Sequence, residues 1–136
     1  MFSIRPFSEN DRQAVIRLWR DIFPDSPRHN DPGEDISRKL AVQRELFVVA
    51  EENGNVLGTA LAGYDGHRGW VYYVAVHPQH RRRGIGAALM ASVEGRLVSV
   101  GCPKVNLQVR TSNRSAGTFY ERLGYGTEER VSMSKR

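Results

Sequence analysis

The spacing of hydrophobic residues predicts which segments form helices and which form strands. Spacing of three to four residues is typical of helices, and alternation is typical of strands. Residues 3–7, "SIRPF", predict a short strand. The next segment, residues 8–23, predicts a helix whose apolar stripe is formed by Val15, Leu18, Trp19 and Ile22. Either Ser8 or Asn10 is expected to cap this helix. Residues 24–35 are rich in proline and turn formers and predict a loop, and a second, shorter helix is expected to begin near Asp35.

The middle of the chain changes to strand-like patterns. The runs "LFVVAEE" (46–52), "VLGTALAGY" (56–64) and "WVYYVAV" (70–76) are rich in β-branched and other apolar residues. Asn53-Gly54 favours a tight hairpin because both residue types tolerate a positive φ, and "DGHRG" (65–69) provides a second turn. The three runs are therefore expected to form antiparallel strands.

After His77-Pro78 the helical period returns. It extends from residue 85 to Gly101, with one face formed by Ile85, Ala88, Leu89, Ser92, Val93 and Leu97. "VNLQV" (105–109) alternates as a strand, and the crossover helix before it favours a parallel pair with the preceding strand. Residues 115–123 predict a last helix with Gly124 as its C-terminal cap. "RVSMS" (130–134) alternates again and predicts a closing strand.

This order of elements predicts the α/β (α+β) class: a mixed, mostly antiparallel central sheet flanked by helices, in one domain over residues 1–136. Apolar residues make up 40% of the chain and charged residues 26%, which is typical of globular domains. No apolar run is long enough to cross a bilayer, and the N-terminal residues do not resemble a secretory signal. A cytoplasmic protein with no membrane partner is therefore expected. The single cysteine, Cys102, excludes an intrachain disulfide and fits a reducing compartment.

The basic residues are spread along the chain, with one exception. The net charge is +5, and acidic residues are interleaved with basic ones almost everywhere. Only residues 81–83 form a concentrated basic block. Nucleic-acid-binding proteins usually present a wider basic face, so no nucleic-acid partner is expected.

This basic block runs directly into Gly84 and Gly86 at the start of a predicted helix, in "HRRRGIGAALM" (80–90). The first N–H groups of a helix lack internal partners, and the helix dipole adds partial positive charge there. Glycines leave the backbone open to an anion, so the segment predicts a phosphate or pyrophosphate site. The plainer alternative is a glycine turn that only starts the helix. Leucine at position 89 excludes a Rossmann fingerprint, and no Gly-Lys-Ser/Thr follows as in a P-loop.

The same stretch resembles a known family. "VAVHPQHRRRGIGAALM" (74–90) is similar to the acetyl-coenzyme A motif of the GNAT superfamily of N-acetyltransferases, whose Arg/Gln-x-x-Gly-x-Gly/Ala pattern is matched by Arg81, Gly84 and Gly86. "NRSAGTFYERLGY" (113–125) resembles their second signature, and the order of elements fits over essentially the whole chain. "YDGHRG" (64–69) and "GCPKV" (101–105) further resemble the bacterial YpeA-type subgroup.

The resemblance implies acetyl-CoA as cosubstrate, no metal, and a set of binding residues. The backbone around Val74, Ala75 and Val76 would hold the pantetheine arm like a further strand. In the family this strand is bulged and splays from the next one, a feature that the sequence does not show. The pyrophosphate would be held by backbone amides of Arg81, Arg82, Arg83, Gly84, Ile85, Gly86 and Ala87. Asn113 would contact the cofactor, and Tyr120 would lie near its sulfur.

The implied reaction moves an acetyl group from a thioester to a primary amine of a small molecule, protein or peptide, with no acyl-enzyme. A backbone N–H near Val76 would polarise the thioester carbonyl. Tyr120 is the expected general acid, although its place on an apolar helix stripe is by itself more typical of a core residue. The general base is left open between a water chain and the side chains of Glu51, Glu52, Asp65, His67 and Tyr72.

Several alternatives stay open from the sequence. Cys102 is interpreted as a small buried residue rather than a nucleophile. Asp31, Asp35 and Trp19 lie in the region that shapes the acceptor site in the superfamily, where the acids would either attract a cationic amine or simply face water. The acceptor is not identified, and a monomer and a homodimer are both compatible with the sequence. The competing functions are an acetyl-CoA-binding protein without turnover and a basic nucleic-acid-binding module.

Overall fold

The computed structural model describes residues 1–136, with the exception of the Arg28 side chain. The strands are β1 (Ser3–Pro6), β2 (Phe47–Glu52), β3 (Asn55–Tyr64), β4 (Gly69–Val76) and β5 (Val105–Leu107). The α-helices are α1 (Arg12–Ile22), α2 (Pro32–Leu40), α3 (Ile85–Ser99) and α4 (Arg114–Arg122), and short 3₁₀ turns cover Glu9–Asp11, Arg28–Asn30, Arg44–Leu46 and Pro78–His80. Within this described part, every helix is too short or too polar to cross a membrane.

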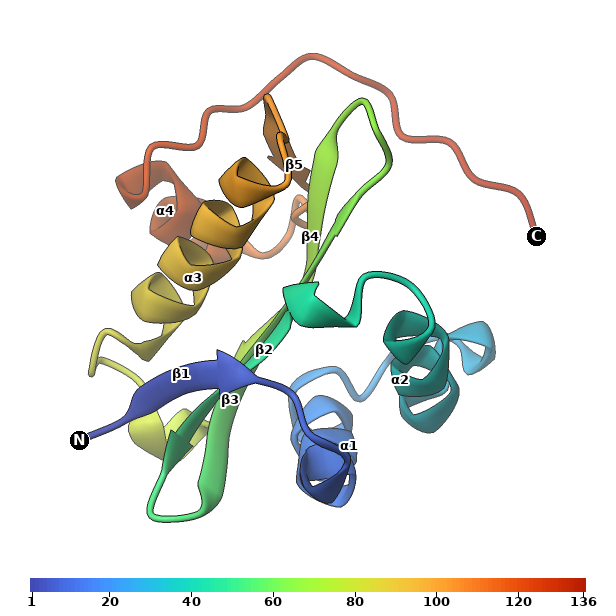
Figure 1. Ribbon diagram of the computed structural model, residues 1–136. Coiled ribbons are helices and arrows are strands. Elements are labelled where there is room, and N and C mark those ends of the chain that lie inside the picture. Colours follow the sequence, from blue (N-terminus) through green and yellow to red (C-terminus); the bar gives the residue numbers. More distant parts are fainter.

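The strands form one sheet in the order β1-β2-β3-β4-β5, in which β4 and β5 are parallel and the other neighbours are antiparallel. Figure 1 shows α1 and α2 on one side of this sheet and α3 and α4 on the other. The predicted fold class and the parallel crossover are therefore confirmed. The β2–β3 hairpin turns at Asn53 and Gly54, whose φ angles of 52° and 80° are the positive values that the sequence predicts.

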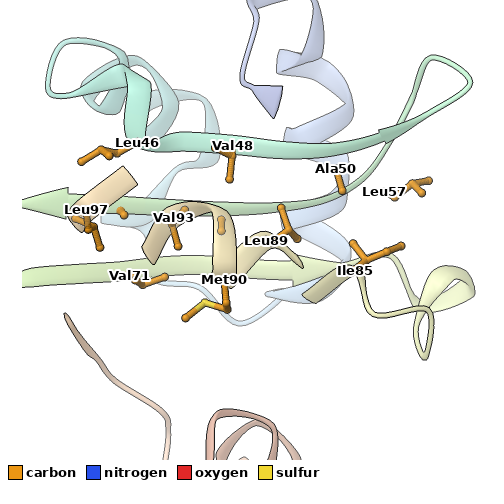
Figure 2. Packing of buried hydrophobic residues seen from close by; sticks show 12 residues of the cluster. Leu46, Val48, Ala50, Leu57, Val71, Ile85, Leu89, Met90, Val93 and Leu97 are labelled. Atoms are coloured by element: carbon orange, nitrogen blue, oxygen red, sulfur yellow. The ribbon is translucent and has the colours of Figure 1, made fainter. Parts of the chain in front are cut away.

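Each face of the sheet buries its own apolar cluster. Figure 2 shows the cluster under α3, formed by Leu46, Val48, Ala50, Leu57, Ala60, Ala62, Val71, Ile85, Leu89, Met90, Val93 and Leu97. The cluster under α1 and α2 is formed by Phe7, Val15, Leu18, Trp19, Ile36, Phe47, Val49, Leu61 and Ala75. Successive residues of β2 alternate between the two clusters, because neighbouring side chains of a strand point to opposite faces. Burial on both faces explains why "LFVVA" is continuously apolar.

Two helix starts differ slightly from the expectation. Helix α2 begins at Pro32 rather than near Asp35, because the Asp31 side chain caps it by accepting a hydrogen bond from the N–H of Glu34 at 3.1 Å. Proline is favoured at the first helical position because its missing N–H would have no partner there. Helix α1 begins at Arg12 with Asp11 as its N-cap, and Ser8 instead precedes the 3₁₀ turn Glu9–Asp11, where its N–H donates to the Asp11 carboxylate at 2.8 Å.

The predicted closing strand at residues 130–134 is wrong. The segment after α4 has no regular secondary structure, and Figure 1 shows it crossing the β5 side of the molecule before running away from it. It is held by an ion pair of Lys104 with Glu128 at 2.6 Å and by a hydrogen bond from Gln108 to Ser132 at 2.8 Å. Val131 is 88% exposed, which shows that the apolar side chain of this segment packs against no other described part of the protein. An alternating pattern forms a strand only where one of its faces packs in this way.

Candidate active site

Strand β4 is irregular where the resemblance places the cofactor slot. Its pairing with β3 shifts between Thr59–Ala75 and Leu61–Tyr72, so that two β4 residues face one residue of β3. At this β-bulge Tyr73 has a φ of 50°, which is uncommon for a residue other than glycine. A bulge bends its strand and increases its twist, which turns the second half of β4 away from its earlier direction.

Beyond the bulge, β4 also parts from β5. The parallel ladder covers only Gly69–Val71 against Val105–Leu107, and within the described chain no β5 partner follows for residues 72–76. The second half of β4 is therefore a strand edge without a partner strand on this side. Such an edge can pair with an extended chain that carries amides.

The exposed edge carries the backbone groups of Val74 and Val76. The N–H of His77 donates to the Leu57 carbonyl on β3 at 2.7 Å. Because backbone groups alternate in direction along an antiparallel ladder, the N–H and C=O of Val76, and those of Val74, point away from β3. The Arg81 guanidinium lies 3.4 Å from the Val76 carbonyl on that side.

The loop after β4 leads directly into the N-terminus of α3. Gly84 precedes the helix with a φ of 78°, and the first hydrogen bond of α3 runs from the N–H of Ala88 to the Gly84 carbonyl at 3.0 Å. The N–H groups of Ile85, Gly86 and Ala87 therefore have no partner within the helix. Together with the helix dipole they form a site that fits a phosphate or pyrophosphate.

The two glycines of the motif serve different purposes. A Cβ at Gly84 would meet no atom within 4 Å, so glycine is needed there for its positive φ. A Cβ at Gly86 would lie 3.1 Å from the Phe119 ring of α4 and 3.7 Å from the Val76 side chain. Gly86 thus lets α4 pack closely against the start of α3, a packing role that the sequence did not indicate.

The three arginines of the loop are also not equivalent. Arg83 forms an ion pair with Glu52 at 2.6 Å and lies 3.0 Å from a ring nitrogen of His80. Arg82 is exposed and has a φ of 66°. Glu52 neutralises the charge of Arg83. Arg81 and Arg82 are therefore the arginines of this loop that can attract an anion to the α3 amides.

Helix α4 places Asn113 and Tyr120 near this region. Asn113 caps α4, and its side-chain oxygen accepts a hydrogen bond from the N–H of Ala116 at 3.2 Å. Tyr120 packs against the cluster under α3, to which Val74 and Val76 also contribute. Burial raises the pKa of Tyr120 to about 12, so its hydroxyl keeps its proton at neutral pH.

Residues 12–125 match the sequence profile of the acetyltransferase (GNAT) family. The chain belongs to this family. It is 45% identical over 133 residues to an acetyltransferase of Yersinia pestis and 46% identical over 133 residues to one of Pectobacterium atrosepticum, in each case covering 98% of this chain and 94% of the relative. Ard1 from Thermoplasma volcanium has a similar structure, with a TM-score of 0.79 and 28% identity over 90% of this chain and 81% of that one. The aminoglycoside N-acetyltransferase AAC(6')-Iy in complex with CoA shares the fold, with a TM-score of 0.83 and 20% identity over 100% and 95% of the two chains.

In this GNAT acetyltransferase the two glutamates considered as general bases are both held in ion pairs. Glu51 lies 2.9 Å from Arg5 on β1, and Glu52 pairs with Arg83 and with the N-terminal ammonium at 3.1 Å. Hydrogen bonding by Arg83 lowers the pKa of Glu52 to about 2, which makes Glu52 a poor base at neutral pH.

The other candidate bases lie in or near the β3–β4 turn. Asp65 accepts hydrogen bonds from the N–H groups of Arg68 and His67, both at 2.8 Å, and these lower its pKa. His67 is an exposed residue of the same turn, and Tyr72 is 54% exposed on β4. Cys102 lies beyond the C-terminal end of α3, opposite to the Gly84 end, where its thiol donates to the Lys104 carbonyl at 3.2 Å. Cys102 is half-buried rather than buried, and it packs against the edge of the cluster under α3.

A polar network that sequence reasoning missed holds the bulge from the α1–α2 side. The indole N–H of Trp19 donates to the Thr59 hydroxyl at 2.9 Å, which donates to the Tyr73 carbonyl at 2.8 Å. The Tyr73 hydroxyl donates to the Asp35 carboxylate at 2.6 Å, and the Tyr73 ring stacks on Trp19 at 3.9 Å. Burial and the bond to Asp35 raise the pKa of Tyr73, so it stays protonated. No local sequence signal marks Thr59 or Tyr73.

A pocket of about 370 Å³ opens beside the stacked pair. Its aromatic walls are Trp19, Phe23 and Tyr73, and Asp31 also lines it. Of the three residues that the resemblance implied for an acceptor region, Trp19 and Asp31 line this pocket, and Asp35 contacts it through its hydrogen bond with Tyr73.

Proposed function

We propose that this chain transfers an acetyl group from acetyl-CoA to a primary amine by direct attack, without an acyl-enzyme. The observation that carries the proposal is the bulge and splay of β4, which leaves Val74 and Val76 without a partner strand on the side facing away from β3. Membership of the GNAT family and the CoA complex of AAC(6')-Iy support the choice of cosubstrate.

Consecutive segments of the chain, from β4 to the start of α3, are proposed to bind consecutive parts of acetyl-CoA. The backbone amides of Val74 and Val76 are proposed to pair with the pantetheine arm as a neighbouring strand would, while Ala75 between them stays paired with β3. The pyrophosphate is proposed to lie against the amides between Arg81 and Ala87, with Arg81 and Arg82 adding charge. Asn113 is proposed to approach the cosubstrate with the amide nitrogen that its capping role leaves free.

Bound acetyl-CoA would supply a thioester carbonyl that an amine can attack. The N–H of Val76 is proposed to donate a hydrogen bond toward the carbonyl oxygen. The Tyr120 hydroxyl, protonated at neutral pH, is proposed to donate its proton to the departing sulfur. Since the candidate carboxylates are engaged, water is proposed to accept the proton of the amine.

A combined binding and turnover experiment tests this function. Acetyl-CoA is titrated by calorimetry, and thiol release is then followed with a panel of amines and peptides. Saturable binding with amine-dependent thiol release is expected. Absence of binding at micromolar protein contradicts the proposal, and strongly salt-dependent duplex binding in its place favours the nucleic-acid module. Binding without release for any amine favours a cofactor-binding protein without turnover.

Three finer assignments are part of the same proposal. The chain is proposed to belong to the YpeA-type subgroup, which "YDGHRG" and "GCPKV" resemble. Residues 1–136 act as one catalytic domain, as a monomer or a homodimer that light scattering will distinguish. Turnover needs no metal, so it is expected to be unchanged by EDTA.

A further inference from the structure

We propose that the acceptor is the α-amino group of an amino acid amide or peptide, whose apolar or aromatic first side chain lies against Phe23 and Tyr73 in the pocket beside Trp19. This inference rests on the proposed acetyltransferase function and names the acceptor class of the same site. It follows from the shape of the pocket, its charge, and the engagement of the nearby carboxylates.

The pocket connects the acceptor side to the cosubstrate slot through one residue. Tyr73 is the bulged residue of β4, and its ring forms a wall of the pocket while its backbone lies on the strand that borders the slot. Phe23 meets the Tyr73 ring edge-on, with the ring centroids 5.4 Å apart. Trp19 stacks on the same Tyr73 ring, with the centroids 3.9 Å apart. An amine whose side chain fills this pocket is therefore held next to the bulge.

The pocket is large enough to admit an apolar side chain together with the amine that carries it. Its volume of about 370 Å³ is near the lower end of the range of small-molecule sites, roughly 300–1,000 Å³. Aromatic walls favour an apolar or aromatic group, because such rings bury large apolar surfaces and stack edge-to-face. An extended polycation would find little complementary surface here.

The charge of the lining fits a single ammonium group. The charged residues at the pocket are Arg20 and Asp31, which cancel one another. One oxygen of Asp31 caps α2 by accepting the N–H of Glu34, so its other oxygen can accept a hydrogen bond from an ammonium. A polycationic acceptor would require several more carboxylates around the pocket than the described residues provide.

The engaged carboxylates favour an acceptor that is already partly neutral. Asp35 accepts from Tyr73 and pairs with Arg38 at 2.5 Å, and Glu51 and Glu52 are in ion pairs of their own. Asp31 is proposed to bind the ammonium, and the other nearby carboxylates are engaged, so the reactive amine is proposed to lose its proton to water. An α-amine has a pKa of about 7.7–8.0 and a lysine amine about 10.4, so roughly a third of the former and a thousandth of the latter is neutral at pH 7.5.

Turnover by the unaltered protein tests the acceptor class directly. With saturating acetyl-CoA, kcat/KM is compared for phenylalaninamide, glycinamide and Nα-acetyllysinamide. We expect phenylalaninamide to exceed each of the others at least tenfold. The pH at which kcat/KM levels off should also follow the pKa of the acceptor when α-amines of different pKa are compared. A higher kcat/KM for the lysine derivative overturns this inference. It is also overturned if kcat/KM levels off at the same pH for every acceptor. Absence of thiol release with every amine instead contradicts the proposed acetyltransferase function.

A variant of Phe23 tests the position of the side chain. Phe23→Ala should reduce the preference for phenylalaninamide over glycinamide at least fivefold, and Phe23→Leu should restore part of it. Val42→Ala, which truncates an apolar side chain that is 60% exposed and outside the pocket, is the matched control. Calorimetry of N-acetylphenylalaninamide with the CoA-bound protein should show a matching loss of affinity in Phe23→Ala. Unaltered acetyl-CoA affinity verifies that the variant is folded, and an unaltered preference in such a variant contradicts the inference.

Discussion

Gly86→Ala gives a sharp measure of how closely α4 packs on the start of α3. The new Cβ would lie 3.1 Å and 3.2 Å from two atoms of the Phe119 ring, so the ring must move by a few tenths of an ångström. Overpacking typically costs about 1–3 kcal/mol. Replacing glycine by alanine in a helix contributes about 0.5–1 kcal/mol in the opposite direction. We therefore expect a net loss of about 1 kcal/mol in the free energy of unfolding.

Gly95→Ala in the middle of the same helix is the matched control. A Cβ at Gly95 would meet no atom within 4 Å, so the substitution should bring only the gain in helix propensity, about 0.5–1 kcal/mol. Urea unfolding followed by circular dichroism measures both variants, at constant m value. Because Phe119 precedes Tyr120 on α4, Gly86→Ala should also lower kcat, whereas Gly95→Ala should leave it unchanged. If both alanines stabilise the protein equally, close packing at Gly86 is refuted.

Three further substitutions test separate parts of the site and fold. Tyr120→Phe should lower kcat at least tenfold, with little change in acetyl-CoA affinity by calorimetry, and an unchanged kcat would remove Tyr120 from the mechanism. Arg82→Ala should weaken acetyl-CoA binding only about two- to fivefold, because the backbone amides remain, and abolished binding would contradict that account. Burial acts to raise the pKa of Asp11, but the hydrogen bonds from Arg5 and Ser8 outweigh it and the pKa is lowered. The stability that this carboxylate contributes is therefore present above pH about 3.9 and lost as the pH falls through its folded-state pKa. Asp11→Asn should flatten the acid side of the stability–pH curve measured by urea unfolding, and an unchanged curve would count against the ion pair.

Local chemistry made much of the fold predictable. The Asn53-Gly54 hairpin follows from two residues that tolerate positive φ, and α3 follows from helical spacing that begins after Gly84. Helix α3 between β4 and β5 returns the chain to the end of the sheet at which β4 began, so the two strands run parallel. The proposed anion site could also be predicted from the sequence. Unpaired N–H groups are a property of any helix start, and Gly84 indicates where α3 starts.

The tertiary structure alone decided which side chains reach the site. Strict alternation along "WVYYVAV" would put Val71 and Tyr73 on one face, but the bulge leaves Val71 in the cluster under α3 and turns Tyr73 to the α1–α2 face. Thr59 and Asp35, distant in sequence, fix that conformation by hydrogen bonds. A bulge at a tyrosine with positive φ is unfavourable on its own and persists because surrounding contacts stabilise it.

The chain by itself thus determined its helices, its turns and the unpaired amides at the start of α3, each of which depends on neighbours within a few residues. Folding decided the roles of Gly86 and Arg83, since the first depends on where Phe119 packs and the second on where Glu52 lies. It also left residues 130–134 without a strand partner, although their pattern is that of a strand. Contacts between residues far apart in the chain are set by packing of the whole molecule, and no local pattern encodes them.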